Sequence, residues 1–206
     1  MGEELRAGER VYGLDIETDT AVNGLDPRVA GVVAVAVSGP RGAKVFSGPE
    51  RLLLWELDEY LHGLEPGVIV TWNGARFDLP FLSDRAALLA VQIGLRLESD
   101  PSLAGTHAPL VGHEWPYRAR WHNHVHLDAY RVFRSESDPE VSCSLKSVAR
   151  AHGLPIVEVD RETIHALDEE ELERYVISDA AATRALALHR WATAERYLDH
   201  QPVQAS

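Results

Sequence analysis

The chain has 206 residues, 45% hydrophobic and 25% charged, and this length and composition suit one soluble domain of α/β or α+β type. No apolar run approaches the roughly eighteen residues of a membrane helix, and the N-terminal segment is charged, so we expect a cytoplasmic protein with no membrane partner. One cysteine, Cys143, excludes an internal disulfide, and the net charge of −12 argues against holding nucleic acid by net charge alone.

The first 50 residues predict three short strands joined by turns. The strands are Val11–Ile16, Val29–Val37 and Lys44–Phe46, and the turn-forming pairs Asn23-Gly24 and Gly39-Pro40 separate them. Because consecutive strands with short connections usually pair antiparallel, we expect an antiparallel meander.

A helix and a buried strand follow the meander. Residues 52–61 carry apolar side chains at helical spacing, and the pattern ends at Gly63. Val68–Trp72 is a short continuous apolar run of the kind found in central strands. A second helix is predicted from about Pro80 into residues 88–93.

Residues 97–121 carry prolines and glycines without a clear period, and we interpret them as a long functional loop. Aromatic rings can stack on bases while arginines contact phosphates, so the loop is a candidate channel for a single strand. The alternative is a surface loop whose tryptophans pack on the core. The side chains that define the channel are Trp115, Tyr117, Arg118, Arg120 and Trp121.

The segment His122–Leu127 alternates as a strand does, which would place His122, His124 and His126 on one face. Three such histidines could bind a transition metal, but we favour a polar strand face that contacts phosphate. Asp128 is either an additional metal ligand or a helix cap, and we favour the cap.

The last third of the chain is predicted to be mostly helical. Leu145–His152 predicts a short helix, and residues 168–198 are rich in strong helix formers. Strands first, followed by alternating helix and strand, predict one α/β domain on a mixed sheet. We assign this domain to residues 1–206, with its core at about 11–198.

Three short segments carry the acids that matter most. Asp15 and Glu17 share one face of the first strand, and two close carboxylates are costly unless a cation lies between them. Taken alone, the pair is better explained by an ordinary acidic strand end that leads into a turn. Asp78 fits a helix N-cap before Leu79-Pro80, and Tyr175 and Asp179 share a face of the last helix.

Together these segments resemble the three motifs of the DEDDy-type 3′–5′ exonucleases, which belong to the ribonuclease H-like superfamily. They are most similar to the proofreading exonuclease domain of family B DNA polymerases. The resemblance runs from about Val11 to Leu188, and Arg174 stands where a histidine variant of the family would carry its histidine. It implies an α/β fold in which a mixed sheet, antiparallel first and then parallel, is flanked by helices. The matching segments are Leu14-Asp15-Ile16-Glu17-Thr18, Asn73-x-x-x-Phe77-Asp78 and Tyr175-x-x-x-Asp179.

The resemblance also implies a role for each matched residue. Asp15, Glu17 and Asp179 would hold one divalent ion. Asp15 would bridge to a second ion, which Asp78 would hold largely through water. Tyr175 would orient the attacking water. Carboxylate oxygens without thiolates indicate Mg²⁺ or Mn²⁺ for both ions.

The implied activity is release of nucleoside 5′-monophosphates from the 3′ end of single-stranded nucleic acid, with DNA favoured over RNA. Asn73 and Phe77 would lie near the substrate strand, although core packing explains Phe77 as well. We expect a stand-alone nuclease, since the chain stops at Ser206, so a role in proofreading or DNA repair would need a protein partner that supplies substrate. Two alternatives are a catalytically silent module that binds nucleic acid or protein, and a small-molecule phosphodiesterase.

Overall fold

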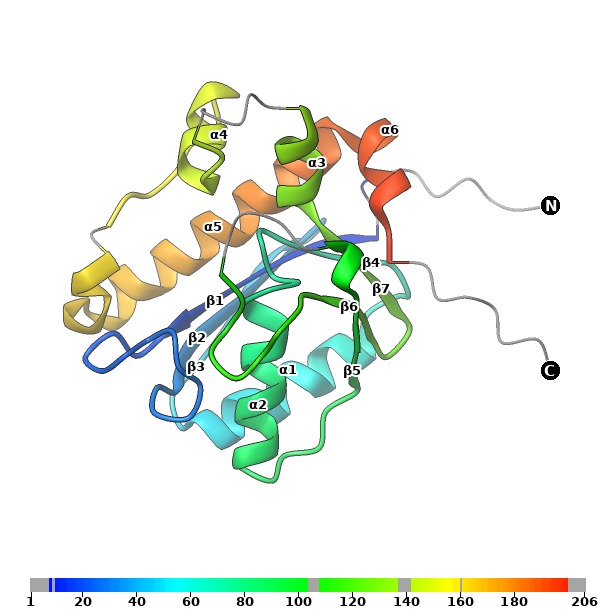
Figure 1. The fold of residues 1–206 in the computed structure, drawn as a ribbon. Helices are drawn as coiled ribbons and strands as arrows, with labels where there is room; N and C mark the ends of the chain where they lie inside the picture. Colours follow the sequence, from blue (N-terminus) through cyan, green and yellow to red (C-terminus); the bar gives the residue numbers. More distant parts are fainter. Residues whose placement is uncertain (1–7, 9, 104–107, 137–141, 160, 200–206) are drawn as a thin grey trace, which may run out of the picture.

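A seven-stranded mixed sheet with the order β3-β2-β1-β4-β7-β6-β5 forms the centre of the molecule (Figure 1). The structure is a computed structural model that describes residues 8, 10–103, 108–136, 142–159 and 161–199. The predicted α/β class and mixed sheet are confirmed. None of the helices in these described ranges is both long and apolar enough to cross a membrane.

The predicted meander is confirmed as one antiparallel half of the sheet. Strand β1 (Val11–Thr18) pairs antiparallel with β2 (Val32–Gly39), which pairs antiparallel with β3 (Gly42–Ser47). Strand β2 begins three residues later than predicted, because the amides of Val29 and Ala30 bond back to the carbonyl oxygen of Asp26 in a turn.

Parallel pairing in the middle of the sheet brings three strand ends to one edge. Strand β4 (Val68–Thr71) pairs parallel with β1 on one side and with β7 (His124–Asp128) on the other. The carboxyl ends of parallel strands lie at the same edge, where open α/β sheets usually bind ligands. The acids of β1, the turn after β4 and Asp128 therefore meet there.

Helices cover both faces of the sheet. Helices α1 (Glu50–Gly63) and α2 (Asp78–Leu88) pack on the face that carries Tyr12, Leu14 and Ile16. Helix α5 (Glu169–His189) packs on the opposite face, against alanines of β2. Because side chains alternate along a strand, Asp15 and Glu17 point toward α5. Smaller elements complete the fold: α3 (Ala129–Glu136), α4 (Leu145–Ala151), α6 (Trp191–Ala194) and three 3₁₀ turns at Pro101–Leu103, Arg161–Ala166 and Glu195–Tyr197.

The interpretation of residues 97–121 as one loop is wrong at both ends. Strands β5 (Leu95–Ser99) and β6 (Tyr117–Trp121) pair antiparallel there and extend the sheet beyond β7. Residues 104–107 of the predicted loop lie outside the described residues, as do residues 137–141 of the predicted core. Strand β5 was not predicted because its alternation of apolar and charged side chains extends over only five residues.

Candidate active site

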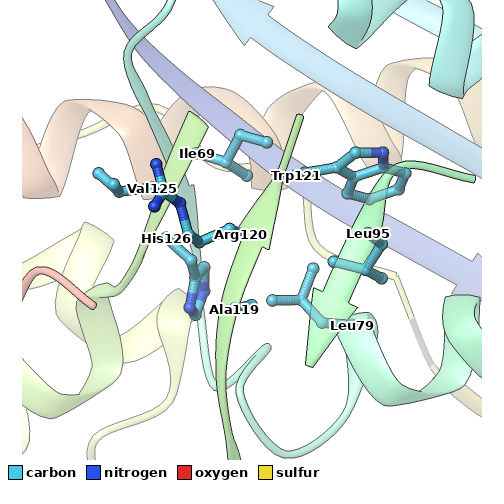
Figure 2. Close-up of a pocket in the computed structure, with 8 residues that line it drawn as sticks. All are labelled: Ile69, Leu79, Leu95, Ala119, Arg120, Trp121, Val125 and His126. Atoms are coloured by element: carbon cyan, nitrogen blue, oxygen red, sulfur yellow. The ribbon is translucent and has the colours of Figure 1, made fainter. Parts of the chain in front are cut away.

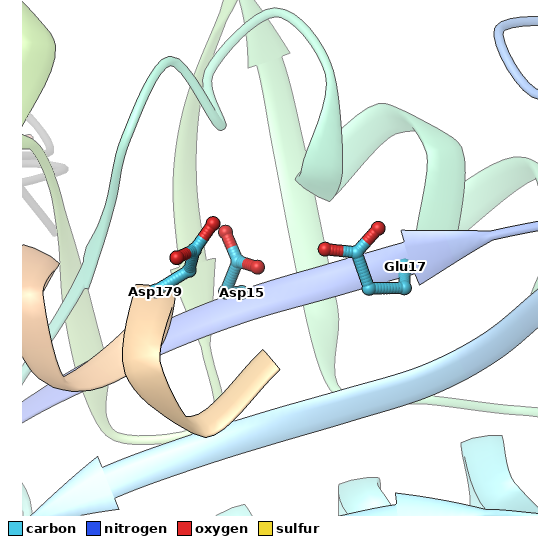
Figure 3. Close-up of side chains that lie close together, drawn as sticks. All are labelled: Asp15, Glu17 and Asp179. Carbon is cyan, nitrogen blue, oxygen red and sulfur yellow. The ribbon is translucent and has the colours of Figure 1, made fainter. Parts of the chain in front are cut away.

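Three carboxylates from two elements converge at the edge where β1 ends. One carboxylate oxygen from each of Asp15, Glu17 and Asp179 lies within 4.8 Å of the others. Figure 3 shows Asp15 on β1 facing Asp179 on α5, with Glu17 further along the strand. Within the part of the chain that the structure describes, this is the one group of three or more acids, histidines or cysteines able to share an ion.

Helix α5 can approach β1 closely because Gly13, on β1, has no side chain. A Cβ atom on Gly13 would lie 2.1 Å from the carbonyl oxygen of Ala180, so only glycine permits this approach. The helix begins with a capping box, in which Asp168 and Glu171 exchange hydrogen bonds with each other's backbone. Tyr175 and Asp179 stand one turn apart on the buried side of α5.

Asp78 lies at the first residue of α2 and is buried. The predicted N-cap role is wrong, because Phe77 occupies the N-cap position and Asp78 is already helical. The pKa of Asp78 is raised to about 7, chiefly by burial and also by the Asp128 carboxylate. Hydrogen bonds from the backbone amides of Asp78 and Ile16 act in the opposite direction. The bond from Ile16 ties Asp78 to β1, between Asp15 and Glu17.

The electrostatics of this group fit a divalent cation. Burial raises the pKa of Asp15 well above its usual value, and the charges of Asp179, Glu17 and Asp78 add to the effect in that order. Crowded carboxylates repel one another until a cation neutralises them, and their hard oxygen atoms suit Mg²⁺, Mn²⁺ or Ca²⁺. The residues present are therefore a suitable set of metal ligands.

A lysine that sequence patterns did not reveal reaches into the acidic group. Lys146 on α4 forms an ion pair with Asp179, donates to the carbonyl oxygen of Val157 at 2.8 Å, and holds its Nζ atom 4.3 Å from the ring centre of Tyr175. Its charge lowers the pKa of Asp15 and partly offsets the repulsion among the acids. The one available signal was rarity, since lysine occurs only at residues 44 and 146.

The turn between β4 and α2, just before Asp78, carries two further predicted residues. Asn73 adopts a left-handed backbone conformation with φ of 65°. Its side-chain oxygen is buried, and no hydrogen-bond partner for it is present among the described residues. Phe77 packs against Phe81, with ring centres 5.4 Å apart, at the border of the α1 and α2 core. The structure thus favours a packing role for Phe77, and the contact of Asn73 with substrate stays a prediction.

Comparison with known proteins bears on what this site is. The family model of the DNA polymerase family B exonuclease domain matches residues 37–148, more than half of the chain. The chain belongs to this exonuclease family. The matched stretch contains the Asn73 to Asp78 segment, and Asp78 in it accepts the amide of Ile16 on β1 and acts through its charge on Asp15.

Individual relatives agree with the family match. The DNA polymerase epsilon catalytic subunit of Aspergillus fumigatus is 31% identical over 156 residues, covering 71% of this chain and 6% of that protein. The Schizosaccharomyces pombe counterpart is 31% identical over 145 residues, with coverages of 68% and 6%. The chain therefore spans only a small part of these relatives' length.

A solved structure supports the fold. The family B DNA polymerase from the hyperthermophilic archaeon Pyrobaculum calidifontis superposes with a TM-score of 0.74 at 22% identity, covering 92% of this chain and 25% of that one. The fold is ribonuclease H-like, as the sequence motifs predicted.

Part of the predicted substrate channel of this exonuclease domain lies inside the core. Trp121 is 2% exposed and donates its Nε1 hydrogen to Asp58 at 2.7 Å, so it cannot stack on a base, and its predicted contact with substrate is wrong. Arg118 is bound to Asp100 and contacts Asp199, and Arg120 is half-buried. The recess that Trp121 and Arg120 help to line has no room for a water molecule (Figure 2).

The predicted row of histidines does not face phosphate. His122 lies in a turn with φ of 50° and stacks on His62, while His124 and His126 are fully buried on β7. His124 bonds the carbonyl oxygen of Leu61, and His126 lies between Thr71 and Asp199. Burial of this strand face, which the edge strands β5 and β6 complete, makes the histidines structural.

Proposed function

We propose that this chain is a metal-dependent 3′–5′ exonuclease that hydrolyses the last phosphodiester bond of a single strand and releases nucleoside 5′-monophosphates. DNA is favoured over RNA as the substrate, because the relatives described above are DNA polymerases. The observation that carries the proposal is the convergence of Asp15, Glu17 and Asp179 within 4.8 Å, beside the buried Asp78. Membership of the exonuclease family supports it.

The four acids would hold two ions, Mg²⁺ or Mn²⁺. Asp15, Glu17 and Asp179 would hold one, and Asp15 and Asp78 the other. When bound, such a pair activates a water nucleophile and stabilises the leaving oxygen of an in-line displacement. The protein itself fixes the acids before any ion binds, through the pleat of β1, the approach of α5 at Gly13 and the amide of Ile16 on Asp78.

Several broader expectations stay predictions. We propose that residues 11–198 act as one exonuclease unit in the cytoplasm, with a protein partner supplying substrate in any proofreading role. The net charge of −12 predicts weak, salt-sensitive capture of substrate.

The deciding experiment uses 5′-labelled single-stranded DNA and RNA, incubated with the protein and Mg²⁺, Mn²⁺ or a chelator. We expect a ladder that shortens from the 3′ end with either metal, faster on DNA, and no shortening with chelator. A control substrate blocked by a 3′-terminal phosphorothioate should resist. No shortening on any substrate with either metal would replace the proposal with the silent module.

Tyr175→Phe is expected to lower the maximal rate about a hundredfold, because the phenol positions the attacking water. The ring is 2% exposed and packs beneath Lys146, so phenylalanine keeps the packing and loses only the hydroxyl group. Single-turnover rates at saturating Mn²⁺ measure the effect. A rate equal to that of the unchanged protein would remove Tyr175 from the catalytic set.

A further inference from the structure

The turn that links β4 to α2 is held in a tight and strained conformation. Asn73 has φ of 65°, which is uncommon for a residue with a side chain. The next residue, Gly74, packs directly on Thr71, and a Cβ atom there would lie 2.2 Å from the Thr71 hydroxyl oxygen. Such a backbone persists only where its surroundings determine it, so something outside the turn must hold it.

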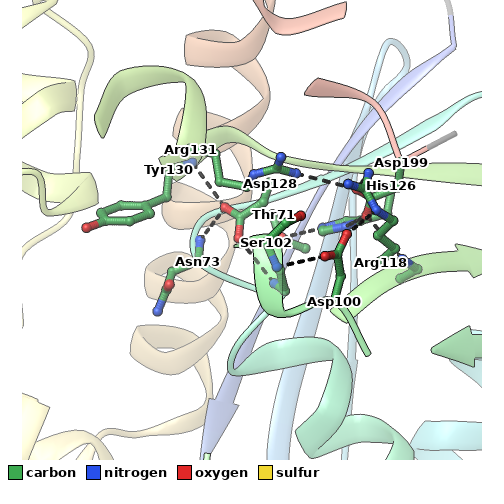
Figure 4. Close-up of polar contacts among 12 residues, drawn as sticks. Thr71, Asn73, Asp100, Ser102, Arg118, His126, Asp128, Tyr130, Arg131 and Asp199 are labelled. Atoms are coloured by element: carbon green, nitrogen blue, oxygen red, sulfur yellow. Dashed lines mark hydrogen bonds and ion pairs between the residues drawn. The ribbon is translucent and has the colours of Figure 1, made fainter. Parts of the chain in front are cut away.

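The carboxylate of Asp128, at the end of β7, fixes the turn through hydrogen bonds (Figure 4). Its Oδ1 atom accepts the amide hydrogen of Asn73 at 2.8 Å, and its Oδ2 atom accepts that of Ala75 at 3.2 Å. Oδ1 also accepts the amide of Tyr130 at 3.1 Å, which is the predicted helix cap, here on α3. Asp128 is 2% exposed, so water does not compete for these bonds.

Strand β7, which carries Asp128, also bonds to the residue at the start of the turn. His126, two residues earlier on β7, makes a 2.8 Å hydrogen bond with the Thr71 hydroxyl and a 2.9 Å bond with Asp199. Thr71 is also the parallel-register partner of Asp128. Strand β7 therefore fixes β4 through one side chain and the turn through another.

We propose that Asp128 is a positioning residue of the exonuclease site, whose carboxylate sets the turn backbone and thereby places Asn73 and Asp78 against β1. The inference rests on the proposed function. Three amide donors converge on this one carboxylate. An asparagine would present an NH₂ group to at least one of them, so the isosteric change Asp128→Asn tests the charge and the acceptors together.

Two variants and a matched control separate positioning from general stability. Asp128→Ser keeps a hydroxyl oxygen that can cap α3 at Tyr130 but is too short to serve the turn. Asp58→Asn is the control, because Asp58 also accepts three donors, from Gly94, Trp121 and His122, and none of these belongs to the turn or to the acidic group. All variants are compared in temperature ranges where circular dichroism shows them folded.

Amide hydrogen exchange gives the readout that does not depend on activity. We expect the amides of Asn73 and Ala75 to be protected in the unchanged protein and to exchange at least about tenfold faster in both Asp128 variants. Asp58→Asn should leave them protected. Fast exchange of these amides in the unchanged protein, or unaltered exchange in Asp128→Ser, would overturn the proposal even if no nuclease activity were found.

Metal binding and kinetics give the functional readouts. We expect both Asp128 variants to need about tenfold or more Mn²⁺ for half-saturation, followed by electron paramagnetic resonance, and to lose rate by a similar factor. Asp58→Asn should keep the Mn²⁺ requirement. Equal Mn²⁺ binding in the Asp128 and Asp58 variants would show that Asp128 only stabilises the fold, whereas inactivity of the unchanged protein would reject the proposed function alone.

Discussion

Replacing Asp15 or Asp179 by alanine is expected to lower the exonuclease rate by about a thousandfold or more. Their oxygens form two corners of the three-carboxylate group, and loss of either one leaves no group of three acids in the described residues to share an ion. Metal-assisted catalysis supplies several kcal/mol of transition-state stabilisation, and about 1.4 kcal/mol corresponds to a tenfold change in rate. Shortening of 5′-labelled single-stranded DNA at saturating Mn²⁺ measures the loss.

Asp15→Ala should be at least as stable as the unchanged protein when no metal is added. Burial and the neighbouring acids raise the pKa of Asp15, so removing its carboxylate relieves repulsion in the metal-free fold, whereas Asp179→Ala also loses the ion pair with Lys146. Glu170→Ala, an exposed acid in the first turn of the same helix, is the control for a change of charge and should keep full activity. Inactive variants that also unfold would attribute the loss to the fold and not to the ligands.

The acids were predictable from sequence because short-range geometry places them. A strand forces Asp15 and Glu17 onto one face, and a helix forces Tyr175 and Asp179 onto one face, whatever the rest of the chain does. Their meeting depends on Gly13, whose missing side chain lets α5 approach β1, and no local pattern reveals that contact.

The sequence-based predictions failed where contacts between residues far apart in the chain decide the structure. Trp121 belongs to β6 and donates a hydrogen bond to Asp58, which is 63 residues away in the chain. Because no local pattern reveals this partner, the aromatic character of Trp121 alone suggested that it stacks on a base. Lys146 reaches Asp179 across 33 residues, and although the helix that carries it was predicted, no local pattern indicated this partner. Long-range partners of single polar side chains lie beyond what periodicity can predict.

The metal-free protein is expected to lose stability as the pH rises from about 4 to about 7, and Asp78→Asn is expected to remove much of that loss. Asp78 has a pKa of about 7 when folded and its ordinary value of 3.8 when unfolded. Between these values the folded state binds more protons, so the free energy of unfolding falls as the pH rises. A shift of this size corresponds to up to about 4 kcal/mol. Asparagine has the same shape without the charge, so it should be more stable than aspartate at pH 8.

Urea denaturation in chelator at several pH values measures the effect, with Asp26→Asn as a control of opposite sign. Hydrogen bonds from Arg28 lower the pKa of Asp26 to about 2, so its charge stabilises the fold at neutral pH and its removal should cost stability there. A stability that stays flat or rises for the unchanged protein from pH 4 to 7 would contradict the expected linkage. Added Mn²⁺ should restore stability at pH 8 more in the unchanged protein than in Asp78→Asn, because a ligand that binds only the folded state stabilises it. A metal ligand is expected to lower the stability of the metal-free protein and to raise that of the metal-bound protein. A purely structural acid would not show both effects.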